Sequence, residues 1–439
     1  MKRSKDKKQF LRNQKYTKVL ASMVLTLIFL ATFGLFAFKN NIAISRRVQK
    51  PSVKLESKVV KSLIKKEIHQ KRETIAPTLG IERMSLYIDS LKGKRIAIVA
   101  NQTSVIANTH LVDTLLALNL NVVKVFAPEH GFRGEMDAGQ HIDHSIDPKT
   151  KLPLISLYGA NKKPSPTQLE DIDIVIYDIQ DVGVRFYTYI STLHYVMEAC
   201  AESKIKLIVL DRPNPNGHYI DGPVLEPTFK SFVGMHPVPI VYGMTVGEYA
   251  KMINGEGWLD NHIKCDLWVI ECMNYTHDYP YHLAIAPSPN LRSDLSIALY
   301  PSLCLFEATT VSIGRGTQKP FEVYGHPKFP KLGFSFTPVS SPGAKNPKHM
   351  NKVCQAIDLS SQLINRVDAL NLNYLIHARD LLGDSIKFID QPSSFNRLAG
   401  TSNLIDQIQN GWTQEQIKAT WQSGLEKFKS IRVKYLIYD

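Results

Sequence analysis

Residues 122–134 read Val-Val-Lys-Val-Phe-Ala-Pro-Glu-His-Gly-Phe-Arg-Gly, and this stretch decides the fold class. Its first part, 122–126, is mostly apolar and predicts a buried strand. A turn bracketed by glycines follows at once and carries Glu129, His130 and Arg133. Because open α/β sheets bind ligands beyond the carboxyl ends of their strands, we expect this charged turn at a ligand-binding edge.

The same arrangement recurs along the chain. Three further apolar runs end in polar residues: 94–100 before Asn101, 173–177 before Asp178, and 206–210 before Asp211. Segments with helical patterning, 109–118 and 188–203, separate these runs. Strands that alternate with helices at this spacing predict βαβ units and a mainly parallel sheet, with the polar loops gathered along one edge.

A second, smaller unit of the α/β or α+β class is expected toward the C-terminus. The strand rhythm weakens near residues 295–325 and gives way to a turn-prone, proline-rich stretch that extends to Pro347. Beyond it, Thr413–Lys429 is predicted to form one helix, because Thr413 begins a capping pattern. We therefore divide the globular part into domains 79–303 and 304–439.

The first 72 residues differ in charge from the rest of the chain. They hold 19 Lys and Arg against three acidic residues, a net charge of +16. The whole chain carries +13, so the remainder is slightly acidic, about −3. This globular remainder implies no basic surface for nucleic acid.

Val19–Phe38 is a 20-residue stretch without a charge, and eight Lys and Arg precede it. An apolar stretch of about 20 residues spans a bilayer as a helix, and basic flanks stay in the cytoplasm. We expect 1–18 to be a cytoplasmic tail, 19–38 a transmembrane anchor and 39–78 a basic stalk, with the catalytic domains in the periplasm or outside the cell. The alternative is a cleaved signal peptide, whose apolar region is usually only about 7 to 15 residues long.

Glu129 is the first catalytic candidate, and His130 and Asp181 are the others. A carboxyl group serves as a general acid when burial or a nearby negative charge raises its pKa toward the working pH. The charged turn, with further carboxylates on a neighbouring loop, suits acid–base work on an uncharged bond. The alternative is that Glu129 forms an ion pair with Arg133 that only fixes the loop.

Other loops supply groups that recognise a polar ligand. Arg185 suits bidentate binding of a carboxylate, and Tyr187 suits stacking on a sugar ring. The glycines of Gly314-Arg315-Gly316-Thr317 let a ligand approach closely, but the loop lacks the pattern of a phosphate cradle, so no nucleotide is implied. His141 and His144 have no third ligand in view, and we expect no metal and no cofactor.

Several longer motifs, taken in order, resemble the exo-β-N-acetylmuramidase family. They are FAPEHGFRG at 126–134, DIQDVGVRFYTYISTL at 178–193, LDRPNPNG at 210–217, YGMTVGEYA at 242–250, SPN at 288–290 and GRGTQKPFEVYGHP at 314–327. The resemblance implies a Rossmann-like N-terminal domain, a smaller C-terminal domain and an active site in the cleft between them. It also implies an exo-acting glycoside hydrolase that releases terminal N-acetylmuramic acid from peptidoglycan fragments.

The resemblance makes Glu129 the acid, which would protonate the glycosidic oxygen. Arg133, Arg185 or Arg315 can bind the lactyl carboxylate of the sugar. The full set of predicted substrate-binding residues is Arg133, Asp178, Arg185, Tyr187, Asp211, Arg212, Asn214, Asn290, Arg315 and Thr317. Whether a second carboxylate or the acetamido oxygen of the sugar attacks the anomeric carbon stays open. The alternative function is a membrane-anchored peptidoglycan-binding protein without turnover.

Overall fold

The structure is a computed structural model that describes residues 75–133, 145–361, 366–384 and 386–439. These residues fall within one compact unit. The expected anchor Val19–Phe38, most of the stalk and the pair His141 and His144 lie outside them. Within the described ranges, no helix combines the length and the apolar composition needed to cross a membrane.

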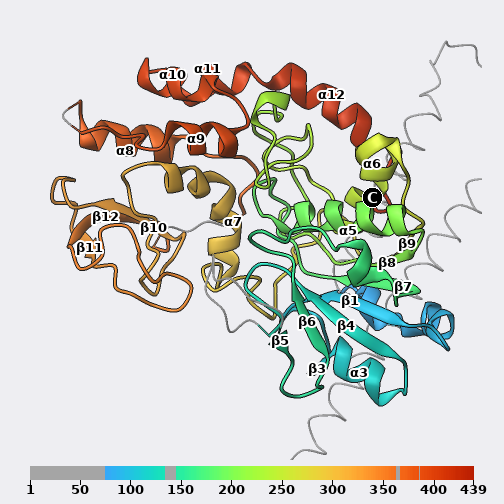
Figure 1. Cartoon of the computed structure of the whole chain (residues 1–439). Coiled ribbons are helices and arrows are strands. Elements are labelled where there is room, and N and C mark those ends of the chain that lie inside the picture. The colour runs from blue at the N-terminus through green and yellow to red at the C-terminus, as the bar shows by residue number, and fades with distance from the viewer. Residues whose placement is uncertain (1–74, 134–144, 362–365, 385) are drawn as a thin grey trace, which may run out of the picture. The chain divides into compact units, whose positions relative to one another are not determined.

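A seven-stranded sheet forms the centre of the N-terminal half (Figure 1). Its strands are β1 (Ile96–Ala100), β4 (Val122–Ala127), β5 (Ser145–Ile146), β6 (Pro153–Ser156), β7 (Ile174–Asp178), β8 (Lys206–Leu210) and β9 (Leu267–Ile270). Their order is β5-β6-β4-β1-β7-β8-β9, and every pair is parallel except β5–β6. The mainly parallel sheet is confirmed, and its six parallel strands follow the Rossmann order 3-2-1-4-5-6.

Both faces of this sheet are buried, which explains why its strands are apolar throughout rather than alternating. Ala97 and Val99 pack with α5 (Tyr189–Ser203) and α6 (Val246–Gly255) on one face. Ile96 and Ile98 face the other way, against α3 and three short 3₁₀ helices. Those elements are α3 (Leu111–Ala117), η1 (Gly80–Glu82), η2 (Met84–Leu86) and η3 (Ile88–Leu91).

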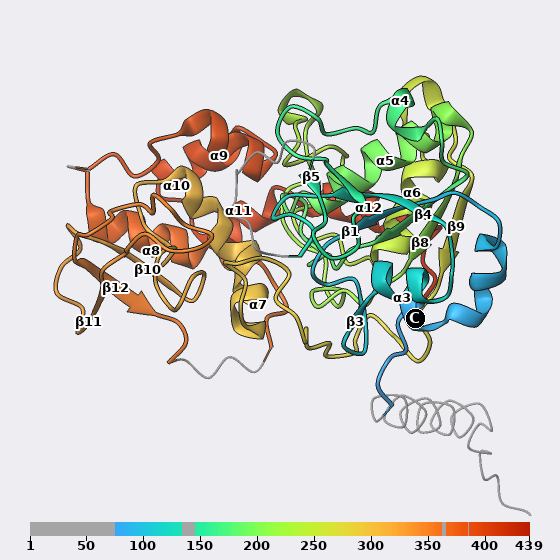
Figure 2. The ribbon, with the colours of Figure 1, turned by 60° about the horizontal axis from the view of Figure 1, so that its bottom comes forward.

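The C-terminal half is smaller and of the α+β class. Its antiparallel sheet has the order β10-β12-β11, with strands β10 (Val323–His326), β11 (Phe334–Phe336) and β12 (Cys354–Asp358). Its helices are α8 (Asn373–Leu382), α9 (Pro392–Ala399), α10 (Asn403–Gln409), α11 (Gln414–Ala419) and α12 (Gln422–Arg432). The helix α7 (Asp294–Leu303) lies between the two halves in both ribbon views (Figures 1 and 2). It passes directly into the 3₁₀ helix η6 (Cys304–Ala308), so the predicted boundary at 303/304 falls within a continuous helical segment.

The prediction of one helix over Thr413–Lys429 is wrong. The capping pattern is real, because Thr413 Oγ1 accepts a hydrogen bond from the amide of Gln416 at 3.3 Å. However, α11 ends at Ala419 and α12 begins at Gln422. Between them, Trp421 is buried and donates from Nε1 to Asp221 at 3.2 Å.

The helical segment predicted at 109–118 begins two residues late. Thr109 and His110 form β3 and pair with β2 (Val105–Ile106). His110 then caps α3, because its Nδ1 accepts a hydrogen bond from the amide of Val112 at 3.2 Å. The helix 188–203 is confirmed as α5.

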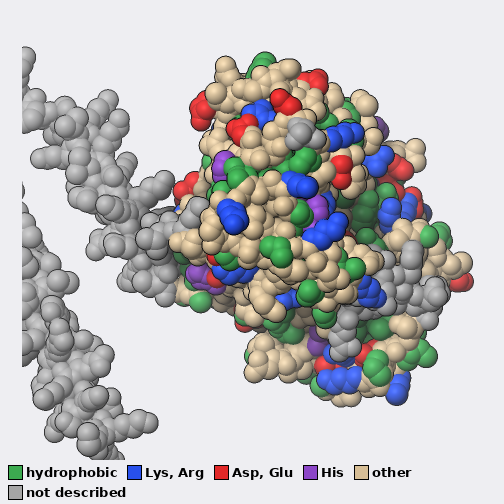
Figure 3. Space-filling model, turned by 90° about the vertical axis from the view of Figure 1, so that its left-hand side faces the viewer, with side chains coloured by type: hydrophobic (Ala, Val, Ile, Leu, Met, Phe, Trp, Pro, Cys, Tyr) green, Lys and Arg blue, Asp and Glu red, His purple; other side chains and the backbone are tan. Residues whose placement is uncertain are grey.

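The outer face of the C-terminal half carries interspersed charges (Figure 3). Basic and acidic side chains are mixed there with hydrophobic and neutral polar ones.

Candidate active site

A cavity of about 210 Å³ lies where the loop after β4 meets the segment from Ser288 to Phe321. Residues from both halves of the chain form its walls. Its polar lining includes Glu129, His130, Tyr158, Thr188, Tyr189, Ser288, Asn290, Tyr300, Glu307 and Arg315. A cavity of this size suits a small ligand or the end of a polymer.

Glu129 is partly buried in the cavity wall, two residues beyond the end of β4. Its Oε2 accepts a hydrogen bond from Thr188 Oγ1 at 3.1 Å, and the Tyr158 hydroxyl also bonds to the carboxylate. Burial raises the pKa of Glu129 despite these donors and the nearby charge of Arg315. A carboxyl whose pKa is raised by burial and which faces a cavity is placed to donate a proton.

The turn after β4 holds Glu129 through an uncommon backbone conformation. His130 and Gly131 have φ angles of 72° and 81°, and the amide of Gly131 donates to the carbonyl of Pro128 at 3.1 Å. Such a tight turn redirects the chain as soon as the strand ends. His130 lines the cavity next to the candidate acid, and its catalytic role stays a prediction.

The alternative ion pair between Glu129 and Arg133 is wrong. Arg133 binds Asp147 instead, from Nε at 3.1 Å and from Nη2 at 2.9 Å, and contacts Asp113 at 3.4 Å. This guanidinium points away from the cavity lining. Glu129 is therefore left with neutral hydrogen-bond donors, which explains why burial dominates its pKa.

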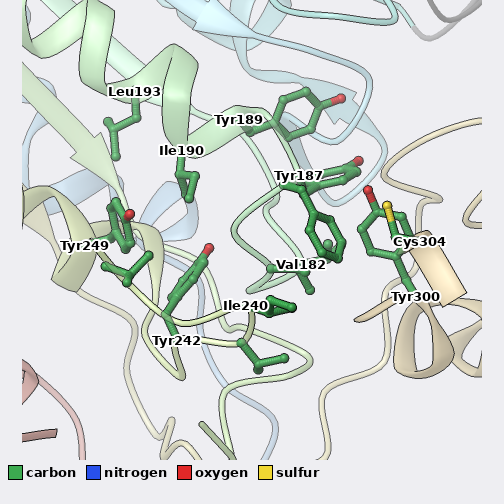
Figure 4. Packing of buried hydrophobic residues seen from close by; sticks show 14 of the residues in the cluster. Val182, Tyr187, Tyr189, Ile190, Leu193, Ile240, Tyr242, Tyr249, Tyr300 and Cys304 are labelled. Atoms are coloured by element: carbon green, nitrogen blue, oxygen red, sulfur yellow. The ribbon is translucent and has the colours of Figure 1, made fainter. Parts of the chain in front are cut away.

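Tyrosines form one wall of the cavity (Figure 4). The rings of Tyr187 and Tyr189 meet edge to face with centroids 4.8 Å apart, and Tyr187 meets Tyr300 at 5.9 Å. The hydroxyls of Tyr187 and Tyr189 donate to the carbonyl of Pro287 at 2.9 and 3.2 Å. This rigid aromatic surface suits the apolar face of a sugar ring.

The cavity contains a second carboxylate that the sequence did not reveal. Glu307 lies on η6, and its Oε1 accepts two hydrogen bonds from Arg315, one of them from Nε at 2.8 Å. Lys348 donates to the carbonyl of Thr309 and lies 3.4 Å from those of Phe306 and Glu307, which fixes the end of η6. Arg315, predicted as a substrate-binding residue, thus lines the cavity together with an unforeseen acid.

Two further lining residues, Tyr158 and Thr188, were also missed. Tyr158 follows β6, whose apolar residues Leu154 and Ile155 are a weak strand signal in the sequence. Thr188 immediately precedes α5 within a motif that the sequence did single out. A tyrosine or a threonine in a loop cannot be identified as a hydrogen-bond donor to Glu129 until the order of the strands in the sheet is known.

The carboxylates after β7 and β8 are engaged within the protein. Asp178 and Arg212 form a bidentate ion pair, Nε to Oδ1 at 2.6 Å and Nη2 to Oδ2 at 2.9 Å, and both side chains are buried. Asp211 accepts hydrogen bonds from Thr245 Oγ1 at 2.7 Å and from Tyr438 at 2.6 Å. These three predicted binding residues lie outside the cavity lining, and their contact with substrate stays a prediction.

Three other candidates also lie outside the lining. Asp181 accepts hydrogen bonds from the Tyr242 hydroxyl and from the amide of Gly183, and burial raises its pKa to about 6. Asn214 Nδ2 donates to the carbonyl of Met244 at 2.9 Å, and Thr317 Oγ1 donates to that of Gly314 at 2.7 Å. Each bond shapes a loop, so a catalytic role for Asp181 and binding roles for the other two stay predictions.

Arg185 is fully buried and is used as a structural clamp. Its guanidinium donates to four carbonyls, those of Pro223, Val238, Leu398 and Ala399, at 2.7 to 3.0 Å. Burial lowers its pKa to about 9. Asn290, by contrast, lines the cavity and donates from Nδ2 to the carbonyl of Gly343 at 2.9 Å.

The described ranges contain no group of three or more His, Cys, Asp and Glu side chains that could hold a metal ion. The polar groups that line the cavity include two carboxylates, one guanidinium, the imidazole of His130 and several phenols. A carboxyl pair of this kind suits hydrolysis of a glycosidic bond.

Comparison with known proteins identifies relatives over both halves of the chain. A family model described as exo-β-N-acetylmuramidase NamZ, N-terminal, matches residues 96–295, and its C-terminal counterpart matches residues 298–438. The peptidoglycan β-N-acetylmuramidase NamZ of Bacillus subtilis (strain 168) is 38% identical over 380 residues, which cover 80% of this chain and 89% of that protein.

Two solved structures of DUF1343 family proteins from Bacteroides fragilis NCTC 9343 have the same fold. One is 48% identical with a TM-score of 0.78, and the other is 28% identical with a TM-score of 0.71. Each alignment covers 83% of this chain and 99% of the solved chain.

Proposed function

The chain belongs to the exo-β-N-acetylmuramidase NamZ family, and on this premise we propose that it hydrolyses the glycosidic bond of a terminal N-acetylmuramic acid residue in peptidoglycan fragments. The observation that carries the proposal is Glu129, a carboxyl group whose pKa is raised by burial and which faces a cavity of about 210 Å³. Its proton passes to the glycosidic oxygen as the bond between that oxygen and the anomeric carbon breaks.

Glu307 is the second carboxylate of this reaction. Glycosidases pair a proton-donating carboxyl with another carboxylate that either activates water or attacks the anomeric carbon. Both bonds from Arg315 end on Oε1 of Glu307, and the Glu307 side chain lines the cavity. In the balanced reaction, water gives its hydroxyl to the anomeric carbon and its remaining proton restores Glu129.

Arg315 recognises the lactyl carboxylate that distinguishes N-acetylmuramic acid from N-acetylglucosamine. Of the three arginines that the sequence proposed for this task, Arg315 alone lines the cavity. A guanidinium binds carboxylates with two parallel hydrogen bonds, and Nη1 of Arg315 makes no hydrogen bond to the described residues. Tyr187 and Tyr189 provide the apolar wall against which the sugar ring packs.

The test is hydrolysis of two chromogenic glycosides by the full-length protein. One carries N-acetylmuramic acid and the other carries N-acetylglucosamine, which lacks the lactyl group. We expect release from the first and much slower release from the second. Saturable binding of muropeptides with no product from either glycoside would overturn the proposal in favour of a non-catalytic wall-binding protein.

The cellular location is proposed from the sequence alone. Val19–Phe38 anchors the protein in the membrane, the basic tail stays in the cytoplasm, and the hydrolase lies outside it, where peptidoglycan is found. A reporter enzyme fused after Asp439 should be active only outside the cytoplasm, and the protein should fractionate with membranes. A freely soluble mature protein that begins near residue 38 would remove the anchor from this proposal.

A further inference from the structure

The loop after β8 does not reach the active cavity, although its motif LDRPNPNG is as rich in polar residues as the loop after β4. It opens instead on a second cavity of about 160 Å³, where Pro215, Asn216 and His218 form one wall. The rest of its lining consists of Asp278–His282, three residues of α7 (Asp294, Ile297 and Ala298), Arg366 and Val367. The carboxyl ends of parallel strands are where such sheets place their ligands, so this cavity is also in a favoured position.

The two cavities are neighbours along α7. Ile297 lines the second cavity and Tyr300 lines the active cavity, three residues apart and therefore on adjacent turns of one helix face. Their positions differ by about 4.5 Å along the helix axis. Leu291, just before α7, lines the active cavity, and Asp294, the first residue of α7, lines the second one. Residues of one short helix therefore line both cavities.

The side chains of the second cavity match the chemistry of a sugar. Tyr279 and Tyr281 are partly buried and present aromatic surfaces. Asp294 is paired with His282 at 2.7 Å, and Asp278 with Arg366 at 3.2 Å, and these pairs are exposed. Exposed pairs of this kind are weak, so their carboxylates can exchange partners for ligand hydroxyls.

His218 adds a defined acceptor. Its Nε2 lies 2.7 Å from the carbonyl oxygen of Val367, so Nε2 carries the proton of the neutral ring and Nδ1 is the acceptor. Burial lowers the pKa of His218, which keeps the ring neutral. The cavity therefore offers aromatic faces, acceptors and donors together.

We propose that this second cavity is a distal subsite that binds a sugar residue of the glycan chain whose terminal N-acetylmuramic acid occupies the active cavity. The inference rests on the proposed function for its biological substrate. The aromatic rings pack against the apolar face of the sugar, and the carboxylates accept its hydroxyls. The subsite thereby favours longer glycans over isolated terminal residues.

The experiment compares full-length Tyr279→Ala with the parent protein on three substrates: the chromogenic muramic acid glycoside, a glycan of two residues and a glycan of six. We expect KM for the six-residue glycan to rise about three- to tenfold, the value of one aromatic contact, with kcat and the chromogenic reaction unchanged. Tyr279→Phe should restore KM, because it keeps the ring. Trp412→Ala, which removes an exposed aromatic side chain outside both cavities, is the matched control.

Direct binding separates this inference from the proposed function. An oligosaccharide of N-acetylglucosamine is titrated by calorimetry into Glu129→Gln and into Glu129→Gln combined with Tyr279→Ala. Binding that is lost in the double variant supports the subsite even if no glycoside is hydrolysed. An unchanged KM for the six-residue glycan, equal changes on short and long glycans, or binding of a free stem peptide instead of the oligosaccharide would overturn the subsite while leaving the hydrolase proposal intact.

Discussion

The loop after β4 and the loops after β7 and β8 start from the same sequence pattern and end in different states. In each, polar residues lie at or within two residues of the end of a buried parallel strand. Glu129 faces a cavity with two hydroxyl donors, whereas Asp178 is neutralised by Arg212 from the adjacent loop. A strand end therefore predicts where polar groups converge, but the neighbouring loop decides whether they are available to a ligand.

The largest effect, on stability, should come from removing the buried ion pair between Asp178 and Arg212. Asp178→Asn leaves the buried Arg212 charge without its partner and should lower the free energy of unfolding by about 3 to 5 kcal/mol. Urea denaturation measures this loss. Adding Arg212→Met should recover much of the stability, since an apolar pair can replace a buried ion pair. Equal stability of Asp178→Asn and the parent protein would show that the ion pair does not stabilise the loops after β7 and β8.

A substitution in the loop after β4 should lower activity rather than stability. Glu129→Gln should lower kcat by about 10²-fold or more, the contribution of a positioned general acid, with little change in the urea midpoint. Substrates with very good leaving groups need less protonation, so their loss should be smaller. Steady-state kinetics on glycosides of graded leaving-group pKa tests this. Identical losses across that series would argue against the acid role.

A third comparison sets Arg315 inside the cavity against Arg133 outside it. Arg315→Lys removes the planar fork and should lower kcat/KM for the muramic acid glycoside about 10- to 100-fold, because hydrogen bonds to charged groups are strong. The N-acetylglucosamine glycoside should be affected far less. Arg133→Lys is the matched control and should leave both rates within about threefold, as expected of a partly exposed ion pair. A stronger effect of Arg133→Lys would reverse the assignment.

The smallest effect concerns the pH dependence of stability, through Asp181 in the loop after β7. The pKa of Asp181 is raised to about 6 by burial. Between the ordinary aspartate pKa of about 4 and this value, the folded protein keeps a proton that the unfolded chain releases. Stability therefore falls as pH rises through this window and levels off above it. Asp181→Asn should reduce the slope by at most about 1.4 kcal/mol per pH unit, as measured by urea unfolding between about pH 4 and pH 7. An unchanged slope would mean that Asp181 does not titrate there.

The sequence predicted the local strands well, but it did not predict which residues from distant segments meet in the cavity. The apolar runs that became β1, β4, β7 and β8 are visible because both faces of the sheet are buried, and Glu129 could be found because it directly follows one of them. Glu307 could not be found. It reaches the cavity only after the chain has crossed from one half to the other, and no local pattern records that approach.

Arginine roles were the other limit of the sequence. Arg185 and Arg315 both lie in polar, glycine-containing loops, and both suit carboxylate binding by residue type. One faces carbonyl groups in the interior and the other a cavity. Only burial separates the two, and burial depends on segments far away in the chain, here Leu398 and Ala399.

The Arg185 clamp also depends on residues that are synthesised late. This buried cation has no acidic partner in the described part of the chain, and two of the four carbonyls that it binds belong to residues 398 and 399. Leu398 itself lines the active cavity. A ribosome that has already translated the Glu129 loop must still add more than 260 residues before that wall exists. The cavity wall is therefore completed only after residue 398 has been synthesised, late in the translation of the chain.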